Sequence, residues 1–333
     1  MFVVHISDVA KRAGVAKSTV SKVLNHYDMV SEETRKKVEQ AVEELGYIPN
    51  SVAVSLSKKK FDRVGLIVDI RHNSQFLDEI SMQYLKGAFE KAKEFSLEVV
   101  TFFSSQFDEM NMKQVISYLR SQRITCLIIY NLSIENQNLH QLVEKQEFCN
   151  VLVDSEISNS KTSSVSIDHY SAQYEVARKT LTENSFIERV LYISGGAGGY
   201  ITNQRLGAMK TLQKELGFEL VVEYGDFNEA KAREITLQYG ESVNAIICAS
   251  DLMAIGAVFA LTDLDIYRPV SGFDGIRLMG YTQIEMNTVK QDFSQKSKRA
   301  FEELQRLLNG NPGRHIRIPY EVCKINYLDV IQR

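Results

Sequence analysis

The chain has 333 residues and a mass of 37.9 kDa, which allows two or three domains. A hydrophobic content of 44% excludes disorder over the whole length, and no apolar run reaches the 18 residues that a membrane span needs. Four widely spaced cysteines without a CxxC pair argue against a zinc knuckle or a disulfide scaffold. With no secretory signal pattern at the start, these features favour a cytoplasmic globular protein.

The net charge of −3 is unevenly distributed along the chain. Residues 1–60 hold ten basic and seven acidic residues, a net charge of +3, whereas the remainder holds 29 basic and 35 acidic residues, a net charge of −6. A small basic segment attached to a larger acidic body indicates a nucleic-acid-binding head, although a solvated surface can produce the same imbalance.

Residues 1–49 carry the pattern of three short helices with tight connections. Apolar residues recur at helical spacing in the first segment, and Gly14 suits the left-handed turn that ends it. Val20 belongs to the apolar stripe of the second segment. Ser31 caps the third helix and Gly46 stops it. The first two helices have the spacing of a helix-turn-helix motif.

The second helix of such a motif lies in the major groove and presents its first residues to base edges. Lysine can donate to guanine, serine is an adaptable reader, and small polar side chains suit phosphates. The predicted DNA contacts are Lys17, Ser18 and Lys22 with bases, and Thr19, Ser21 and Asn25 with phosphates. The alternative is a three-helix bundle with incidental surface lysines.

From residue 61 onward, β-branched runs alternate with amphipathic helical segments. The runs are VGLIVDI, LEVVTFF, CLIIY, NVLVD, RVLYIS, LVVEY, AIICAS and PVSGF. Buried strands that alternate with helices predict a doubly wound parallel α/β sheet, and some 270 residues of this pattern predict two such lobes. Residues 50–60 between the two regions read as a linker that becomes helical on a partner.

The head resembles the DNA-binding domain of the lactose-repressor (LacI/GalR) family. The similar residues are ISDVAKRAGVAKSTVSKVLN, then VSEETRKKVEQAVEELGYIPN, then a short A-x-x-L segment. The resemblance implies that 50–60 forms a hinge helix on a palindromic operator, with Leu56 as the minor-groove wedge and Ala53 as the small residue that lets two hinge helices approach. Val54 departs from the arginine that members often have there.

The remainder resembles the periplasmic-binding-protein-like core of the same family. The matching runs are VGLIVDI, RVLYISGG, QRLGAMKTL, AIICASDLMAIGA and SGFDGI. The resemblance implies a core over 61–333, with an N-lobe of about 61–165 and 291–321 and a C-lobe of about 166–290 and 322–333. An effector would bind in the cleft between the lobes.

Ligands of doubly wound sheets sit outside the carboxyl ends of the strands. The resemblance implies that Arg205 clamps effector hydroxyls and that Asp274 accepts sugar hydroxyls, while Ser250 stands where members commonly have Asn. A strand-end residue that merely caps the next helix is the structural alternative, above all for Asp251. The predicted effector contacts are Phe76, Asp154, Arg205, Ser250, Phe273 and Asp274.

The glycine-rich loop 195–199 raises the alternative of a dinucleotide-binding enzyme. Its spacing fails, because Ile201 stands where the third glycine of GxGxxG belongs, and the loop lies in mid-chain. No Ser-His-Asp order, HExxH or P-loop is visible, so we expect neither enzyme activity nor a cofactor or metal.

The sequence therefore predicts a DNA-binding transcription regulator, most simply a repressor, with an all-α helix-turn-helix head and an α/β core of two lobes. We expect a homodimer, double-stranded operator DNA as a partner, and a sugar or sugar phosphate as effector. The alternatives are control by a protein co-regulator and, more remotely, a solute-binding protein or a Rossmann-type enzyme.

Overall fold

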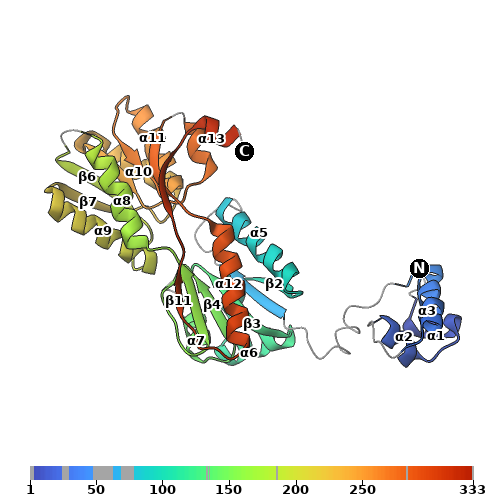
Figure 1. The fold of residues 1–333 in the computed structure, drawn as a ribbon. Helices are drawn as coiled ribbons and strands as arrows, with labels where there is room; N and C mark the ends of the chain where they lie inside the picture. The colour runs from blue at the N-terminus through green and yellow to red at the C-terminus, as the bar shows by residue number, and fades with distance from the viewer. Residues whose placement is uncertain are drawn as a thin grey trace. The chain divides into compact units, whose positions relative to one another are not determined.

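The computed structural model describes residues 4–24, 30–47, 63–68, 79–132, 134, 136–184, 187–282 and 284–331. The chain divides into two compact units, Met1–Asp62 and Arg63–Arg333. They are called the head and the core below, and each is described by itself (Figure 1). No helix among the described residues is long and apolar enough to cross a membrane.

The described part of the head is a bundle of three helices around a small apolar core. The helices are α1 (Ile6–Ala13), α2 (Lys17–Leu24) and α3 (Glu32–Leu45). Gly14 and Gly46 end α1 and α3 with φ values of 66° and 59°, which L side chains adopt at a cost. The Ser31 hydroxyl accepts from the backbone N–H of Thr34 at 3.4 Å, as the cap prediction required.

The N-lobe of the core is built on a six-stranded parallel sheet in the order β11-β5-β4-β3-β1-β2. Helices α5 and α12 cover one face of this sheet, and α6 and α7 pack on the other (Figure 1). The strands are β1 (Arg63–Val68), β2 (Glu98–Phe103), β3 (Ile124–Tyr130), β4 (Cys149–Val153), β5 (Thr162–Ser166) and β11 (His315–Arg317). The helices are α5 (Glu79–Glu94), η1 (Ser104–Phe107), α6 (Met112–Ser121), α7 (Gln137–Glu144) and α12 (Phe293–Leu308).

The C-lobe has a second sheet in the order β12-β10-β9-β8-β6-β7, in which only the pairing of β12 with β10 is antiparallel. Helices α8 and α9 pack together, as do α10 and α11. The strands are β6 (Arg189–Ser194), β7 (Glu219–Tyr224), β8 (Ala245–Cys248), β9 (Val270–Ser271), β10 (Met286–Lys290) and β12 (Glu321–Ile325). The helices are α8 (His169–Thr182), α9 (Tyr200–Leu216), α10 (Glu229–Tyr239), η2 (Gly240–Ser242), α11 (Asp251–Asp263), η3 (Arg277–Thr282) and α13 (Tyr327–Ile331).

The chain passes between the lobes three times, from β5 to α8, from β10 to α12 and from β11 to β12. The predicted fold class, a helical head followed by two doubly wound lobes, is confirmed. Strands β5 and β10 were absent from the predicted runs because TSSVS and MNTVK are polar, although every residue of β5 is buried.

Candidate functional site: a DNA-reading helix and a buried ring in the cleft

The exposed face of α2 carries the predicted DNA contacts. Val20 and Val23 are buried against α1 and α3, which turns the opposite side of the helix outward. Lys17, Ser18 and Lys22 are exposed, so their polar groups are available to a duplex. Thr19 and Ser21 are half-buried at the edge of this face. The predicted contacts Asn25, Ala53 and Leu56 lie outside the described residues.

Asp154 follows β4 of the N-lobe and is the centre of a buried polar cluster. It takes a φ of 60°, uncommon for a residue with a side chain, and is 5% exposed. Its Oδ2 accepts from the Tyr84 hydroxyl at 2.5 Å, and its Oδ1 accepts from Lys296 Nζ at 2.5 Å. Lys296, on α12, is fully buried. A lysine is rarely found at such depth unless it is paired, and Asp154 supplies the pairing charge.

His169, the first residue of α8, joins this carboxylate to the C-lobe. Its Nε2 lies 3.1 Å from Asp154 Oδ1, and its Nδ1 lies 3.2 Å from an Nη atom of Arg205. The second Nη of Arg205 donates to the Ala249 carbonyl. A guanidinium can only donate, so Nδ1 must accept and Nε2 must carry the proton that is donated to Asp154. The contacts therefore define one neutral tautomer of His169.

Two further side chains close the cluster into a ring. Gln291, on the crossing from β10 to α12, accepts from Lys296 Nζ at 2.5 Å and donates to Asp274 Oδ1 at 2.9 Å. Asp274 Oδ1 lies 4.0 Å from an Nη of Arg205, which completes the circuit. We call this set of six side chains the cleft ring: Asp154, His169, Arg205, Asp274, Gln291 and Lys296.

Burial governs the ionisation of the cleft ring. It lowers the pKa of His169 to about 4, and Arg205 and Lys296 act in the same direction while Asp154 opposes them. The pKa of Asp154 is lowered although burial raises it, because the charges of Lys296 and the bonds from His169 favour the carboxylate. Burial raises the pKa of Asp274 well above its ordinary value, against the attraction of Arg205. The ring therefore holds a neutral His169 between the ionised carboxylate of Asp154 and the guanidinium of Arg205.

The structure thus brings four of the predicted effector contacts together. Asp154, Arg205 and Asp274 belong to the cleft ring, and the Phe273 ring stacks on Arg205 with 3.5 Å between its centroid and Cζ. Ser250 lies at the next strand end, where its hydroxyl accepts from the Met253 N–H at 3.3 Å and caps α11. Phe76 lies outside the described residues. Binding of an effector by these residues stays a prediction.

Asp251 has a structural role, but not the helix cap that was its alternative, because Ser250 caps α11. Its carboxylate accepts from the backbone N–H groups of Gly275 and Ile276 at 2.7 and 2.8 Å and from the Thr288 hydroxyl at 2.6 Å. Burial nevertheless raises its pKa to about 6. This aspartate fixes the loop that follows β9, on which Asp274 sits.

Sequence reasoning missed four members of this region, namely Tyr84, His169, Gln291 and Lys296. Tyr84 and Lys296 lie on N-lobe helices and share Asp154 as a partner, whereas His169 and Gln291 lie where the chain passes between the lobes. His169 follows the polar strand β5, just after the lobe boundary that was predicted near residue 165. Asp168 caps α8 by accepting from the Ser171 N–H at 3.0 Å, which is a local signal for the start of this helix.

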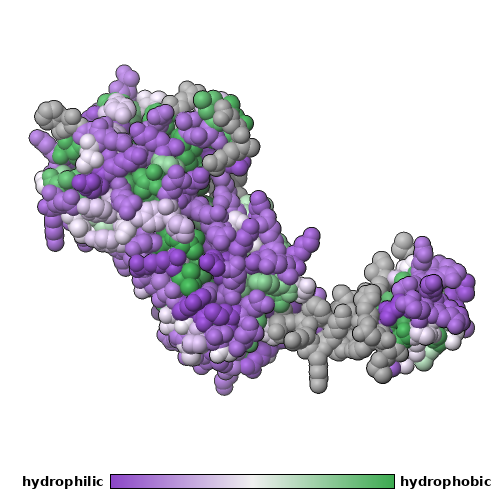
Figure 2. All heavy atoms as spheres, in the orientation of Figure 1, coloured by the Kyte–Doolittle hydropathy of each residue, from purple (hydrophilic) through white to green (hydrophobic). Residues whose placement is uncertain are grey.

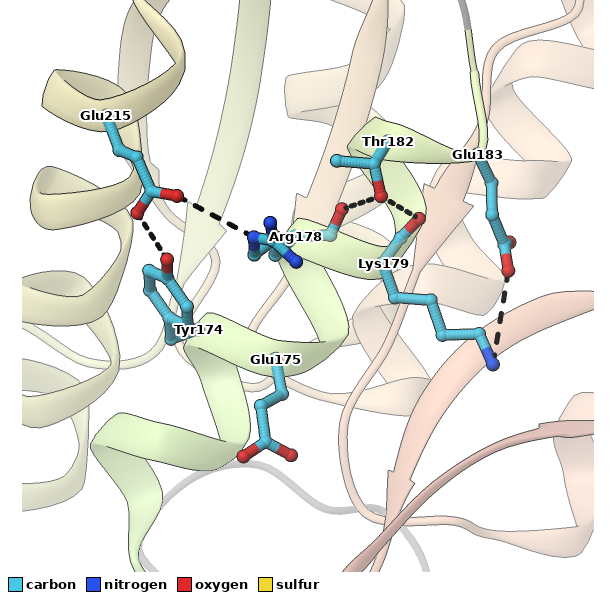
Figure 3. Close-up of a pocket in the computed structure, with 7 residues that line it drawn as sticks. All are labelled: Tyr174, Glu175, Arg178, Lys179, Thr182, Glu183 and Glu215. Carbon is cyan, nitrogen blue, oxygen red and sulfur yellow. Dashed lines mark hydrogen bonds and ion pairs between the residues drawn. The ribbon is translucent and has the colours of Figure 1, made fainter.

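A separate shallow pocket lies on the outer surface of the C-lobe, where α8 runs beside α9 (Figure 3). Its charged groups are largely satisfied by one another. Glu215 accepts from the Tyr174 hydroxyl and lies 3.7 Å from Arg178 Nε, and Lys179 Nζ lies 3.9 Å from Glu183. None of the predicted effector contacts lines it. No cluster of three potential metal ligands occurs among the described residues.

The exposed reading helix and the two-lobed core with polar strand ends define a DNA-binding regulator that carries a ligand-binding domain. Comparison with known proteins identifies the family. Residues 5–50 match the bacterial regulatory proteins of the lacI family, and residues 62–305 match the periplasmic binding proteins and sugar binding domain of the LacI family. The chain belongs to the LacI family of transcription regulators.

Individual relatives are distant but similar over most of their length. The HTH-type transcriptional regulator AscG of Escherichia coli is 28% identical over 85% of this chain and 85% of its own. The regulator RegA of Clostridium saccharobutylicum is 29% identical over 91% and 92%. A lac repressor dimer bound to operator and the anti-inducer ONPF has a TM-score of 0.80, with 22% identity over 98% of this chain and 99% of its own. These relatives are regulators of transcription.

Proposed function

We propose that this protein is a transcriptional repressor whose affinity for a palindromic operator is controlled by a small effector in the interlobe cleft. The observation that carries the proposal is the pairing, in one chain, of an exposed helix-turn-helix reading face with a core whose strand ends converge on the cleft ring. A regulator of this kind acts where the DNA is, which is the cytoplasm of a bacterium. Nothing in the proposal calls for catalysis or for a cofactor.

Operator reading is assigned to the exposed face of α2. Lys17, Ser18 and Lys22 would donate to base edges, whereas Thr19 and Ser21 would hold phosphates. The side chains of the three base readers face away from the head core, so they can change partner without disturbing its packing. Asn25, Ala53 and Leu56 complete the proposed contacts from the sequence alone.

A sugar or sugar phosphate is the proposed effector. Asp274 has 13% of its side chain exposed, more than Arg205 beside it, and a sugar hydroxyl can donate to its carboxylate. Arg205 keeps its Nε without a partner although that atom is buried, so the guanidinium retains a donor for a ligand oxygen. Phe273, Asp154 and Ser250 shape the remaining wall. The match of 62–305 to a sugar-binding domain supports the same class.

A thermal-shift screen of sugars, sugar phosphates and nucleobases tests this proposal, because a ligand that binds only the folded protein raises its melting temperature. Asp274→Asn should abolish the ligand-induced shift, which is measured against the variant's own ligand-free melting temperature. Asp263→Asn is the matched control, because Asp263 pairs with Arg233 on the exposed surface far from the ring. If no small molecule of these classes shifts the wild type, a protein co-regulator becomes the better proposal.

A homodimer is proposed because a palindromic operator needs two reading heads. The described C-lobe exposes large apolar side chains near its end, on η3 and α13, and Figure 2 shows hydrophobic side chains among hydrophilic ones on the visible face of the core. Tyr281 and Tyr327 pack edge to face there with centroids 5.8 Å apart while both stay more than half exposed. Light scattering should give roughly 76 kDa, the mass of two 37.9 kDa chains, and a stable monomer or tetramer would contradict the proposal.

A further inference from the structure

The face of the C-lobe sheet that α8 covers buries polar side chains without partners. Within the described residues, ten buried side-chain nitrogen and oxygen atoms have no hydrogen-bond partner, and six of them belong to this region. They are Gln173 Nε2 and Oε1, Tyr192 Oη, Ser194 Oγ, Ser271 Oγ and Asn287 Oδ1. Each of these five residues is no more than 4% exposed. Their concentration in one place indicates a common cause.

The strand register brings three of these side chains into one row across the sheet. Tyr192 of β6 pairs with Ile247 of β8, Ile247 pairs with Ser271 of β9, and Ser271 pairs with Asn287 of β10. Neighbouring residues in register point to the same face of a sheet, so Tyr192, Ser271 and Asn287 share one face. Ser194 follows Tyr192 by two residues on β6 and points to that face as well.

Helix α8 covers this row and adds the fifth side chain. Near the end of the helix, Thr180 Oγ1 accepts from Asn287 Nδ2 at 3.1 Å. At its start, the His169 ring lies 6.0 Å from the ring of Phe273, which follows the row by two residues on its strand. Gln173 is fully buried on the same helix between these two contacts. Its amide therefore lies over the same face of the sheet.

Arg205 of α9 lies next to the same row. Burial raises the pKa of Tyr192, and the nearby Arg205 and Ser194 oppose that rise. The hydroxyls of Ser194 and Tyr192 are therefore close together, although they form no hydrogen bond with each other. Leu191 and Ile193 point to the opposite face of β6 and are apolar. On this strand, the polar layer is thus confined to the side that faces α8 and α9.

The chemistry of the unpartnered atoms selects the occupant of this layer. The hydroxyls of Tyr192 and Ser271 can donate or accept, whereas the amide oxygens of Gln173 and Asn287 can only accept. An anion such as chloride cannot donate to an amide oxygen, and a cation is repelled by the guanidinium of Arg205. Water both donates and accepts, and a buried water typically makes about three hydrogen bonds to groups that otherwise lack a partner.

We propose that the C-lobe binds ordered water between its sheet and helices α8 and α9, held by the Gln173 amide and the hydroxyls of Tyr192 and Ser271. Without such a partner, each of these buried groups would destabilise the fold by more than an ordinary hydrogen bond stabilises it. The helices that carry His169 and Arg205 of the cleft ring would then contact the sheet partly through water. The inference needs neither effector nor operator, so it can fail while the proposed function stands, and the reverse.

The variant Tyr192→Phe tests the proposal by the sign of its effect, because it removes one hydroxyl and keeps the ring. If water binds there, hydrogen bonds are lost and the unfolding equilibrium constant of the core should rise roughly two- to tenfold in urea denaturation of the full chain. If the hydroxyl is buried without water, the variant should be more stable than the wild type. Tyr130→Phe is the matched control, because the hydroxyl of this buried tyrosine is hydrogen-bonded to Ser297 Oγ at 2.6 Å and its loss should destabilise the core. Stability of Tyr192→Phe at or above that of the wild type would overturn the proposal.

A second measurement holds even if Tyr192→Phe does not fold. A high-resolution crystal structure of the wild-type chain should show water within hydrogen-bond distance of the Tyr192 hydroxyl and of Gln173 or Ser271. Crystals grown with bromide in place of chloride distinguish a halide from water by its anomalous signal. Direct hydrogen bonds among these side chains with no water between them, an empty layer, or a bound halide would each contradict the proposal.

Discussion

The head and the cleft ring carry function in opposite ways. The head has an apolar core, with Val9, Val20 and Val38 fully buried, and its proposed DNA contacts stand in solvent. The ring places its functional groups in the interior, where Lys296 is fully buried and Arg205 is 3% exposed. In the head, stability and function rest on different residues. In the ring they rest on the same residues.

This difference has an energetic origin. An exposed lysine stays hydrated when the protein folds, so it can exchange water for a phosphate or a base without destabilising the fold. A buried lysine is stable only while its counter-charge is present, because an isolated ion in the interior costs several kcal/mol. A substitution in the ring is therefore expected to disturb folding and regulation together, whereas a substitution on the outer face of α2 should affect DNA binding alone.

The largest effect is expected for Lys296→Met. Methionine keeps the volume of the side chain but leaves Asp154 as a buried carboxylate without its cation, which typically costs about 3–5 kcal/mol. The melting temperature of the core, followed by calorimetry, should fall accordingly. Lys298→Met, two residues further along α12, removes only a partly exposed pair with Glu90 and should change the stability by less than about 1 kcal/mol.

The double variant Lys296→Met/Asp154→Asn tests the cause of that loss. Removing both charges eliminates the unpaired carboxylate, so the double variant should be more stable than Lys296→Met alone. If the double variant is instead less stable by the sum of two large losses, the packing of the lysine stem rather than its charge holds the site together.

An intermediate effect is expected for Val20→Ala in the head. This side chain of α2 is fully buried in the core that α2 forms with α1 and α3. Loss of its two methyl groups should lower the free energy of unfolding of the head by about 2 kcal/mol. Hydrogen exchange of α1, α2 and α3 should accelerate, while the melting temperature of the core stays the same. Glu39→Ala, at an exposed position of α3, is the control. A parallel loss of stability in the core would contradict this expectation.

The fold was predictable because local patterns carry it. Helical spacing and the terminating Gly14 defined α1, and runs such as VGLIVDI and RVLYIS defined β1 and β6. The hydrophobic pattern did not predict strands whose buried residues are polar. Strand β5 has four Ser or Thr residues among five yet is wholly buried, because β4 and β11 flank it and Glu303 of α12 accepts from Ser163 at 3.1 Å. When a buried polar side chain is hydrogen-bonded by a helix that is distant in sequence, the residues around it carry no pattern that predicts its burial.

The site was predictable only in part, for the same reason. Arg205 and Asp274 were predicted because they lie in runs similar to those of a known family, Arg205 near the start of α9 and Asp274 after β9. Lys296 and His169 lie in helices whose sequences give no reason to bury a charge. Their partners are 142 and 15 residues away along the chain, so only the folded lobes reveal the ring.

The smallest effect on stability, and a large one on DNA binding, is expected for Lys22→Ala. The side chain is exposed, so the free energy of unfolding of the head should change by no more than about 0.5 kcal/mol. Its melting temperature should change correspondingly little. If Lys22 reads a base edge, the affinity for an operator selected from random DNA should fall by about 1–3 kcal/mol, and the preference should relax at one base pair in each half-site. Affinity for a random duplex should fall much less.

Lys36→Ala supplies the charge control for that experiment, because Lys36 is an exposed lysine on α3 rather than on the reading helix. The control should weaken operator and random DNA by the same small amount and reduce the salt dependence of both, as expected for loss of a nonspecific attraction to phosphates. Fluorescence anisotropy with labelled duplexes at two salt concentrations separates the two cases. An equal loss on both DNAs for Lys22→Ala would assign Lys22 to phosphate contact, and base reading would then fall to Lys17 and Ser18 at the start of the same helix.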